Sequence, residues 1–499
     1  MKILSSKAIR TVDAKTIEYN GIESHELMER AAFAFTNYFI KHYFIDERVA
    51  IFSGTGNNGG DGVAVARMLY MAGNTVKLYI VEVGSSYSKD CLLNIERAQK
   101  AGVEAIKIGS VDEMPNLEDI DVVVDAMFGT GLSHPLSGLA KEVVEAINTL
   151  QKRVVSIDIP SGLFMNKPTE VAIHATETVT FQIPKLALFL PDNSQFVGRL
   201  FTVDIELDAK AIDEAETNSY YLTKDDMAHL LKPLDKFTHK GLQGHALIIG
   251  GSLGKTGAVT LASKAALRSG CGLVTAYVPK CGMIPIQSIL PEAMVVQDDN
   301  MHTHISAISY SIKPSAIAIG MGMGQHSDTE SALRKFLKGC TTPLVVDADA
   351  LNILSKHPDW LKYLPPGSIL TPHPKELSRL IGEWSDDFDK IERSRLFARK
   401  YNIIVVIKGA HTLIVDTDNI YVNSSGTPAL ATAGSGDVLS GIIAGLLAQG
   451  YKPIVASQLG VYIHGMTATI ASKEINPRSF IATDIINNIG KVYDSMSTR

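Results

Sequence analysis

The segment VAIFSGTGNNGGDGVAVARMLYMAG (residues 49–73) decides the fold class of the first half of the chain. VAIFSG (49–54) is a short apolar run typical of a buried strand, and VAVARMLYMAG (63–73) has the spacing of an amphipathic helix. NNGGDG (57–62), between them, has the composition of a glycine-rich loop. A strand that passes through a glycine turn into a helix predicts the first unit of a parallel α/β sheet.

The same order of elements continues along the first half. TVKLYIVEV (75–83) predicts the next strand and is followed by a helix. DIDVVVDAMFGTG (119–131) and RVVSIDIPSG (153–162) predict two more buried strands, each ending in a loop that contains glycine. This alternation predicts a Rossmann-like, doubly wound parallel sheet with helices on both faces. Because ligands bind such sheets beyond the carboxyl ends of the strands, we expect these glycine loops to border one pocket.

The pattern begins afresh after DAKAIDEAETNSY (208–220), a polar and acidic stretch. We predict one domain over residues 1–212, a linker over 213–222 and a second, larger α/β domain over 223–499. Strand and helix signals alternate again in the second half, and a helix opens directly from a glycine turn in GSGDVLSGIIAGLLAQG (434–450). The predicted strands lie in HALIIGGS (245–252), GLVTAYVP (272–279), PSAIAIG (314–320), PLVVDADAL (343–351), GSILTPH (367–373) and NIIVVIKGAHTLIV (402–415).

The composition is that of a globular chain with an ample core, since 45% of its 499 residues are apolar and 20% are charged. The net charge of −6 argues against nucleic acid as the main partner. The four cysteines form no CxxC pair, which indicates reduced thiols in a cytoplasmic protein. The first residues soon turn polar, and no apolar run approaches the roughly 20 residues of a membrane span. We therefore expect neither a secretory signal nor membrane association.

Two glycine loops invite comparison with known phosphate sites. GGSLGKTGA (250–258) contains Gly-Lys-Thr, but the NTPase loop also needs a glycine five residues before Gly254, where this chain has Ile249. Lys255 is therefore not expected to bind a triphosphate. GTGNNGGDG (54–62) joins a strand to a helix, so its N–H groups favour an anion, although a tight turn without a ligand is the alternative.

ATAGSGD (431–437) is the strongest indication of phosphate chemistry. Its glycines lie where a helix begins, so free backbone N–H groups are expected to face an anion. Asp437 beside such a site can take the proton of a hydroxyl group that attacks a phosphoryl group. The alternative is that Asp437 only caps the helix.

Two further features follow predicted strands of the second half. Lys408 ends an apolar strand, where its charge can neutralise phosphate, although a lone lysine is usually just solvated. In HPKE (373–376), Glu376 can position a water bound to Mg2+ and His373 can contact a substrate.

These motifs together resemble those of bifunctional NAD(P)H-hydrate repair enzymes. The similarity to the epimerase domain of that family lies in GTGNNGGDG, DAMFGTG and SIDIPSG. The similarity to the ribokinase-like dehydratase domain of the same family lies in HKGLQGHALIIGGSLGKTGA, PEAMVV, DADAL, TPHPKE, IKGAHT and ATAGSGDVLSG. The resemblance covers nearly the whole chain. It implies an enzyme that interconverts the R and S hydrates of NADH and NADPH (NADHX and NADPHX) and dehydrates the S form with ADP, giving AMP and phosphate.

The resemblance also implies roles for residues of the first domain. A potassium ion (K+) would be held by Asn58, Asp125 and Ser161. We expect Asp158 to be the acid–base group of epimerisation, with a hydrogen bond to ribose as its alternative role. The substrate would be bound by Asn57, Asn58, Gly59, Gly60, Asp61, Phe128, Gly129, Thr130, Gly131, Leu132, Ser133, His134 and Asp158.

In the second domain the resemblance makes Asp437 the base that deprotonates the hydroxyl of the hydrate, before that oxygen is phosphorylated and expelled. The substrate would be bound by Ala258, Gly322, His373, Pro374, Lys375, Glu376, Leu377, Ser378, Arg379 and Asp437. The nucleotide would be bound by Lys408, Gly409, Ala410, His411, Thr412, Thr427, Pro428, Ala429, Leu430, Ala431, Thr432, Ala433, Gly434, Ser435 and Gly436. The family usually has GPGLG where this chain has GMGMG (320–324).

Two other functions fit parts of the sequence. Ribokinase-like vitamin and sugar kinases share the GSGD arrangement, but they usually have Asn at the position of His373, and they would not need the first domain. The first domain alone fits a module that binds dinucleotide without chemistry. ADP and ATP both remain candidate phosphoryl donors, NADHX and NADPHX both remain candidate substrates, and the resemblance implies a homo-oligomer.

Overall fold

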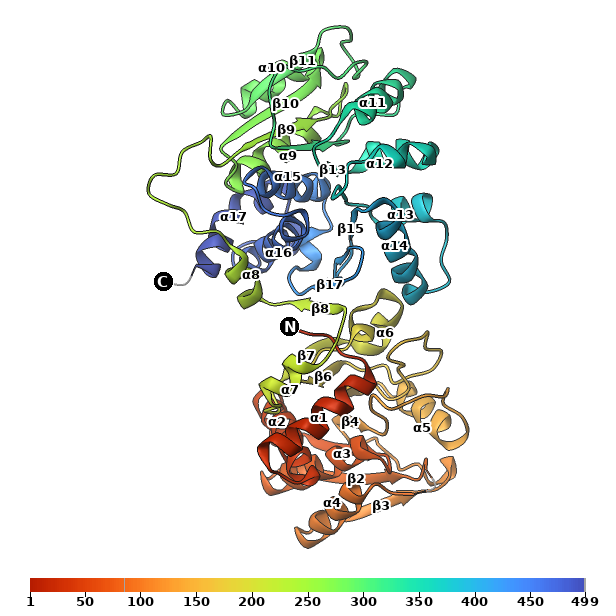
Figure 1. Cartoon of the computed structure of the whole chain (residues 1–499). Helices are drawn as coiled ribbons and strands as arrows, with labels where there is room; N and C mark the ends of the chain where they lie inside the picture. The colour runs from red at the N-terminus through yellow and green to blue at the C-terminus, as the bar shows by residue number, and fades with distance from the viewer. Residues whose placement is uncertain (85, 498–499) are drawn as a thin grey trace. The chain divides into compact units, whose positions relative to one another are not determined.

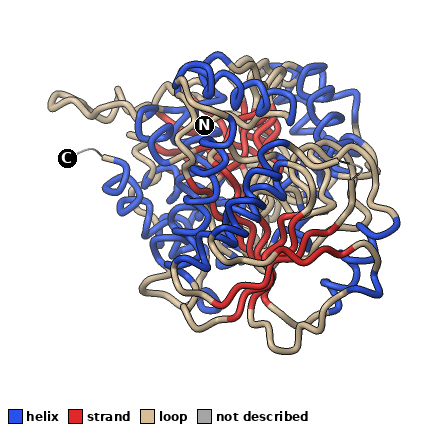
Figure 2. The backbone as a smooth tube through the Cα atoms, turned by 90° about the horizontal axis from the view of Figure 1, so that it is seen from below, coloured by secondary structure: helices blue, strands red, loops and turns tan. Residues whose placement is uncertain are grey.

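The computed structural model describes residues 1–84 and 86–497. The chain divides into two compact units, the first formed by residues 2–219 with residues 386–388, and the second by most of the other residues from Tyr220 onward. Each unit contains one sheet whose strands lie between helices (Figures 1 and 2). The expected fold class, a Rossmann-like α/β domain followed by a ribokinase-like α/β domain, is confirmed.

The first sheet is parallel throughout and has the order β3-β2-β1-β4-β5-β6-β7. Its strands are β1 (Arg48–Ser53), β2 (Thr75–Val81), β3 (Ala105–Ile108), β4 (Val122–Ala126), β5 (Arg153–Ile157), β6 (Glu177–Phe181) and β7 (Arg199–Val203). The helices of this unit are α1 (Ser6–Asn20), α2 (Ser24–His42), α3 (Asn57–Met71), α4 (Lys89–Lys100), α5 (Gly138–Thr149), α6 (Ser194–Val197) and α7 (Ala209–Glu214). The strand order reverses between β1 and β4, and this switch point is where a ligand crevice is expected.

The NNGGDG segment is not a loop, contrary to the sequence prediction, because α3 begins at Asn57. The glycines allow the first turn of α3 to lie against the strand ends. A Cβ on Gly59 would lie 1.9 Å from the carbonyl oxygen of Gly54, and a Cβ on Gly62 would lie 2.5 Å from the Cβ of Ala126. Glycine at these positions is therefore required by close packing of helix and strand.

The second sheet has the order β11-β10-β9-β12-β13-β14-β15-β16-β17-β8. Its strands are β8 (Ser219–Leu222), β9 (His245–Ile249), β10 (Leu273–Pro279), β11 (Met294–Asp298), β12 (Ala316–Ile319), β13 (Leu344–Val346), β14 (Ile369–Leu370), β15 (Ile404–Ile407), β16 (Leu413–Val415) and β17 (Ile420–Asn423). The helices are α8 (Lys224–Leu230), α9 (Thr256–Arg268), α10 (Lys280–Ile289), α11 (Ser327–Gly339), α12 (Ala348–Lys356), α13 (Pro374–Ile381), α14 (Asp387–Tyr401), α15 (Ser435–Ala448), α16 (Pro453–Ala471) and α17 (Ala482–Met496).

Helices α9, α15, α16 and α17 pack together on one face of this sheet, whereas α11, α12 and α13 lie on the other (Figure 1). Right-handed crossovers explain this division, because the chain moves from β9 toward β10 in one direction and from β12 toward β15 in the other. The glycine turn of GSGD opens α15, as the sequence predicts.

The segment 402–415 forms two strands rather than the single one predicted. β15 and β16 are antiparallel, and residues 408–412 form the turn between them. β15 is the last strand of the parallel part of the sheet, and the turn after it reverses the chain. Lys408 therefore lies at the carboxyl end of β15, on the same edge of the sheet as the carboxyl ends of the other parallel strands. The polar stretch 208–220 also contains regular structure, namely α7 and the first two residues of β8.

One helix, α16, is long and apolar enough to cross a membrane, with a mean hydropathy of 1.2 over its best window. The expectation that no segment approaches this length and composition is therefore wrong. The window is 67% buried inside the structure, and α16 packs against α15 and α17. Its apolar character is thus used in the core of the second unit.

Candidate active sites

The first sheet has a cavity of about 690 Å³ beyond the carboxyl ends of its strands. The turn before α3, the loop after β4 and the residue after β5 all line it. Every residue that the resemblance assigns to the substrate of this domain lines the cavity except Gly59 and Gly60. Those two are buried in the first turn of α3, where they serve packing.

Asp158 follows β5 directly and has a φ of 66°, which is uncommon for a residue other than glycine. Its Oδ1 accepts hydrogen bonds from Oγ1 of Thr180 (3.1 Å) and from the backbone N–H of Phe181 (3.0 Å), and it is ion-paired with Nζ of the buried Lys185. The hydrogen bonds from the described part of the chain to this carboxylate all reach Oδ1, so Oδ2 stays available to a ligand in the cavity. A fixed side chain in an uncommon backbone conformation is typical of an active site.

Two more carboxyl groups line the same cavity, Asp13 on α1 and Asp61 on α3. Burial and the charge of Asp158 raise the pKa of Asp13 to about 6, which the charge of Lys185 partly opposes. Burial raises the pKa of Asp61 well above its usual value, and the charges of Asp158 and Asp13 add to the rise. A carboxyl group with such a pKa can hold or release a proton near neutral pH, so the cavity is equipped for acid–base chemistry.

Asp125, at the end of β4, is buried and accepts hydrogen bonds from neutral groups within the described residues. The donors include Oγ of Ser156 and the backbone N–H of Ser161, both at 2.8 Å. Burial raises the pKa of Asp125, and these hydrogen bonds oppose the rise. Nδ2 of Asn58 donates to the carbonyl oxygen of Phe128 at 3.0 Å, and the N–H of Phe128 donates to Ser161. A buried carboxylate among hydroxyl, amide and carbonyl oxygens suits a monovalent cation.

Charged side chains also gather at the carboxyl ends of the second sheet. Nζ of Lys408, after β15, donates to Oδ1 of Asp347, after β13, at 2.9 Å, and lies 3.9 Å from Oε2 of Glu376. Asp347 also accepts a hydrogen bond from the hydroxyl of Ser440 on α15 at 2.7 Å. Burial disfavours the charge on Lys408, but the carboxylates of Asp347 and Glu376 outweigh it and raise its pKa. Lys408 is thus a stable cation at a place where phosphate is expected.

Asp437 lies in the first turn of α15, whose N-cap is Gly434 with a φ of 83°. It is therefore not the N-cap, which was the alternative left by the sequence. Burial, followed by the charge of Asp347, raises the pKa of Asp437 to about 7, while Lys408 opposes the rise. A carboxylate that titrates near neutral pH at a helix N-terminus, beside a lysine, is suited to take a proton from a hydroxyl group next to phosphate.

The glycine loops after β9 and β12 contact each other beside this group. A Cβ on Gly322 would lie 2.6 Å from the carbonyl oxygen of Lys255 and 3.1 Å from the Cβ of Ala258. Oδ2 of Asp349 accepts a hydrogen bond from the N–H of Gly324 at 2.9 Å and lies 3.9 Å from Nζ of Lys255. The structure thus brings together Ala258 and Gly322, two of the residues expected to bind the substrate.

The predicted substrate residues after β14 form the start of α13. His373 is its N-cap, with Nδ1 accepting the N–H groups of Lys375 (3.2 Å) and Glu376 (3.3 Å). Glu376 in return accepts the N–H of His373 at 2.9 Å, which completes a capping box. Arg379, on the same helix, donates to Oδ1 of Asn352 on α12. His373 and Arg379 therefore have structural partners.

The segment expected to bind the nucleotide before α15 rests on a buried histidine. Nε2 of His464, on α16, lies 3.0 Å from the carbonyl oxygen and 3.1 Å from Oγ of Ser435. Burial, opposed by the hydrogen bond with the backbone of Ser435 and assisted by the charge of Lys408, lowers the pKa of His464 to about 4. The ring is therefore neutral and supports the turn without adding charge.

Four residues of these two sites were not identified from the sequence, namely Asp13, Lys185, Asp347 and His464. Asp347 and Lys185 each follow a strand, and a search of strand ends would find them. Asp13 lies in the middle of α1, and His464 lies within an apolar helix. No local pattern distinguishes the latter two from ordinary helix residues.

The two sites define a two-domain α/β enzyme equipped for acid–base chemistry in one domain and for phosphate chemistry in the other. A family described as NAD(P)H-hydrate dehydratase matches residues 246–491, and a family described as YjeF-related protein N-terminus matches residues 24–187. The bifunctional NAD(P)H-hydrate repair enzyme Nnr of Moorella thermoacetica is 36% identical over 488 residues, covering 93% of this chain and 92% of that protein. The enzyme of the same description from Escherichia coli is 30% identical over 491 residues, covering 97% and 93%.

The chain belongs to the family of bifunctional NAD(P)H-hydrate repair enzymes. Its expected resemblance to that family is confirmed over nearly its whole length. Among solved structures, the ADP/ATP-dependent NAD(P)H-hydrate dehydratase of Bacillus subtilis, co-crystallised with ATP and Mg2+, is 28% identical. That similarity has a TM-score of 0.49 and covers 56% of this chain and 100% of the other.

Proposed function

We propose that the second domain dehydrates the S hydrate of NAD(P)H at the expense of ADP, with Asp437 as the base. The observation that supports this role is the position of Asp437, which lies at the start of α15 with a pKa raised to about 7 and an electrostatic interaction with Lys408. The substrate class is supported by the dehydratase family that matches residues 246–491.

The proposed reaction has two steps. In the first, the hydroxyl oxygen of the hydrate attacks the terminal phosphorus of ADP, its proton passes to Asp437, and the bond from phosphorus to AMP breaks. In the second, the lone pair of the ring nitrogen expels phosphate, and loss of a proton from the neighbouring ring carbon restores the double bond. Phosphorylation is needed because hydroxide is a poor leaving group and phosphate is a good one. The N–H groups of α15 and the charge of Lys408 would stabilise the transferred group.

The residues that we propose to bind each ligand are those assigned by the resemblance. ADP would lie between the turn 408–412 and the segment 427–436, and the hydrate would lie against Ala258, Gly322 and the start of α13. Glu376 would hold a Mg2+ ion through water, as carboxylates do, while its Oε2 also accepts the N–H of His373 and lies 3.9 Å from Nζ of Lys408. That ion would neutralise charge on the phosphates.

In the first domain we propose that Asp158 acts at the hydrated carbon, and that Asp13 and Lys185 assist it. Oδ1 of Asp158 is occupied by three donors, so Oδ2 would exchange the proton with the substrate. Lys185 would hold the Asp158 carboxyl group in its orientation through their ion pair. Asp13, with a pKa of about 6, would serve as the second group that gives or takes a proton.

We also propose that K+ binds beside this cavity through oxygens of Asn58, Asp125 and Ser161. The support is the buried carboxylate of Asp125, which accepts hydrogen bonds from uncharged hydroxyl and N–H groups of the described residues. The ion would fix the loop after β4 against Asn58 and so shape the cavity. We further propose a cytoplasmic homo-oligomer, since the four cysteines are free thiols and the resemblance implies an oligomer.

The test uses purified S hydrate with ADP and Mg2+, and follows NADH absorbance and inorganic phosphate together. The wild-type enzyme should release one phosphate for each NADH, and Asp437→Asn should lose at least about 100-fold in rate. The same assay is run in parallel with ATP. If ATP supports turnover and ADP does not, ATP is the phosphoryl donor. A stable phosphorylated product in place of NADH would instead identify a small-molecule kinase.

A further inference from the structure

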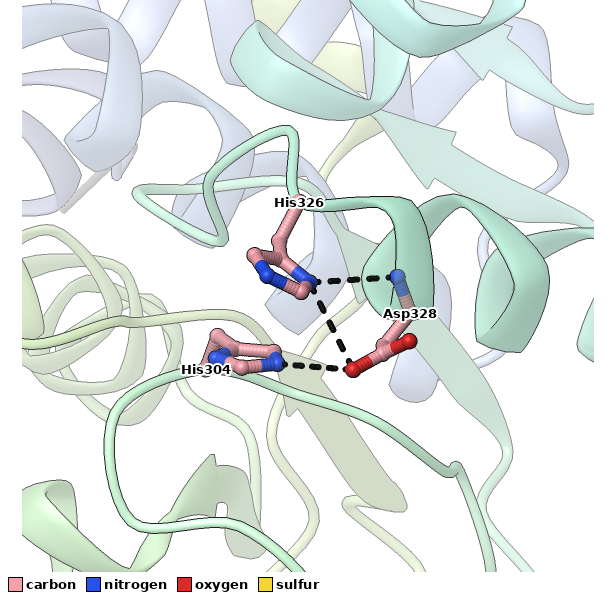
Figure 3. A group of neighbouring side chains, drawn as sticks. All are labelled: His304, His326 and Asp328. Carbon is pink, nitrogen blue, oxygen red and sulfur yellow. Dashed lines mark hydrogen bonds and ion pairs between the residues drawn. The ribbon is translucent and has the colours of Figure 1, made fainter.

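His304, His326 and Asp328 come together in the second domain, and the proposed reaction uses none of them (Figure 3). His304 lies in the connection between β11 and β12, and the other two lie at the start of α11. One ligand atom from each residue lies within 4.8 Å of the others. The three side chains point toward one another in Figure 3, with the carboxylate of Asp328 facing both imidazole rings.

The distances within this group match those between the ligands of a small metal ion. Nε2 of His304 lies 3.3 Å from Oδ2 of Asp328, and Nδ1 of His326 lies 3.5 Å from the same oxygen. Ligands about 2.0–2.1 Å from a tetrahedral zinc ion are about 3.3 Å apart. An ion can therefore bind here with small shifts of the side chains.

The fold holds the two segments in place independently of these side chains. The carbonyl oxygen of Thr303 accepts the N–H of Leu253 at 2.8 Å, and the carbonyl oxygen of Ile305 accepts a hydrogen bond from the buried hydroxyl of Thr329 at 2.7 Å. The first bond fixes His304 against the 250–258 loop, and the second fixes it against α11. These two bonds position the backbone on either side of His304 before any ion binds.

The electrostatics of the group also favour a cation. Nδ1 of His326 accepts the N–H of Asp328 at 3.2 Å and faces a carboxylate oxygen of the same residue at 3.5 Å, so an ion that binds this nitrogen takes the place of that hydrogen bond. Two groups that only accept hydrogen bonds repel each other at this distance, and a cation between them removes the repulsion. The two imidazole rings are stacked with centroids 4.0 Å apart. The side chains of His326 and Asp328 are 53% and 48% exposed, so an ion can enter from solvent.

We propose that His304, His326 and Asp328 bind one divalent transition-metal ion, with zinc as the reference ion. Two imidazole nitrogens and one carboxylate oxygen suit zinc, nickel or copper better than Mg2+ or Ca2+, which prefer oxygen ligands alone. Three protein ligands leave a fourth position for water or a small anion. The bound ion ties the β11–β12 connection to α11, next to the 250–258 loop of the dehydratase domain.

The experiment is titration calorimetry of the full chain, stripped of metal with a chelator, with zinc chloride as the titrant. The wild-type protein should bind one zinc ion that is lost, or at least tenfold weaker, in His304→Ala and in Asp328→Asn. His302→Ala is the matched control, because it removes an exposed neighbouring histidine and should bind zinc as the wild type does. Substitution by cobalt should give the strong visible absorption of a tetrahedral site in the wild type and in the control only.

Circular dichroism of each variant separates loss of a ligand from loss of the fold. The proposal is overturned if the wild type binds no zinc, or if His304→Ala and His302→Ala bind it equally. It is also overturned if the cobalt-substituted His304→Ala variant gives the same visible spectrum as the cobalt-substituted His302→Ala control. Because dehydratase activity is not the readout, failure of this site leaves the proposed reaction unaffected.

Discussion

Nζ of Lys408 donates a hydrogen bond to Oδ1 of Asp347 across 2.9 Å and so joins the ends of β15 and β13. Asp347 is 2% exposed, and its other oxygen accepts a hydrogen bond from the hydroxyl of Ser440 on α15. Through Asp347, the turn of residues 408–412 is thus connected to the helix that carries Asp437. Lys408 and the helix that carries Asp437 are bound to the same buried carboxylate, whose charge also acts on Asp437.

Replacing Lys408 by methionine should affect both stability and catalysis. Asp347 would stay buried without its partner, which typically costs about 3 kcal/mol of unfolding free energy. The transferred phosphoryl group would lose its cation, and we expect dehydratase turnover to fall about 100-fold or more. Urea unfolding and the NADH assay measure the two effects. Lys473→Met, at an exposed position, is the control and should change neither; a Lys408→Met enzyme of normal turnover would remove Lys408 from the site.

The dehydratase should depend on pH through Asp437, which must be ionised to act as a base. With a pKa of about 7, kcat/KM for the S hydrate should rise as pH increases from 6 to 8 and then level off. Stability should change in the opposite sense, because the folded protein holds a proton on Asp437 that the unfolded chain has released above its ordinary pKa of 3.8. This contribution is fully present at low pH and is lost as pH rises through 7. A flat rate profile over this range would contradict the role of Asp437.

Asp158→Asn should abolish epimerisation and leave dehydration of the S hydrate intact. The amide keeps the size of the side chain, but it cannot take up a proton, and its NH2 group is poorly matched to the donors of Lys185 and Phe181. Conversion of purified R hydrate, followed by chromatography, should fall about 100-fold or more. Asp112→Asn, at an exposed position of the same domain outside the cavity, is the control. Undiminished epimerisation in Asp158→Asn would leave Asp158 with a binding role only.

Gly436→Ala tests the space between the first turn of α15 and Lys408. A Cβ there would lie 3.3 Å from Nζ of Lys408 and 3.8 Å from Oδ2 of Asp347. Alanine is a better helix former than glycine by about 1 kcal/mol, so stability should not fall. The displaced lysine should instead raise the KM for ADP several-fold. An unchanged KM would show that this part of the turn does not approach the nucleotide.

Removal of potassium should destabilise the first domain. In thermal unfolding, replacing K+ by a bulky organic cation should lower the Tm of wild-type protein by a few degrees, because bound K+ stabilises only the folded form. Asp125→Asn should abolish this dependence on K+, since the buried charge that attracts the ion is gone. A Tm that is equally insensitive to K+ in both proteins would rule out the ion at this place.

The sequence predicted the architecture well because both halves have strong strand and helix periodicity with glycine at the turns. It missed the helical start of NNGGDG, because glycines favour loops locally and only their contact with the strand ends reveals the packing. It also missed the hairpin at 408–412, since an apolar run does not show where a chain reverses.

The candidate sites were predictable only where a residue belongs to a local motif. Asp437 stands in GSGD and Asp158 in DIPS, and both lie at strand or helix ends as expected. Asp13 reaches the first cavity from α1, far away in the sequence, and the buried His464 reaches the turn before α15 from α16. Long-range packing of this kind leaves no trace in the local pattern.

The measurement that tests the central claim most directly is recovery of NADH from an equal mixture of R and S hydrates with ADP and Mg2+. We predict that the absorbance returns in full, faster than the hydrates interconvert spontaneously, because both domains act on one pool. Asp158→Asn should stop at the S half, and Asp437→Asn should recover none. No recovery by the wild type with either ADP or ATP would contradict the account.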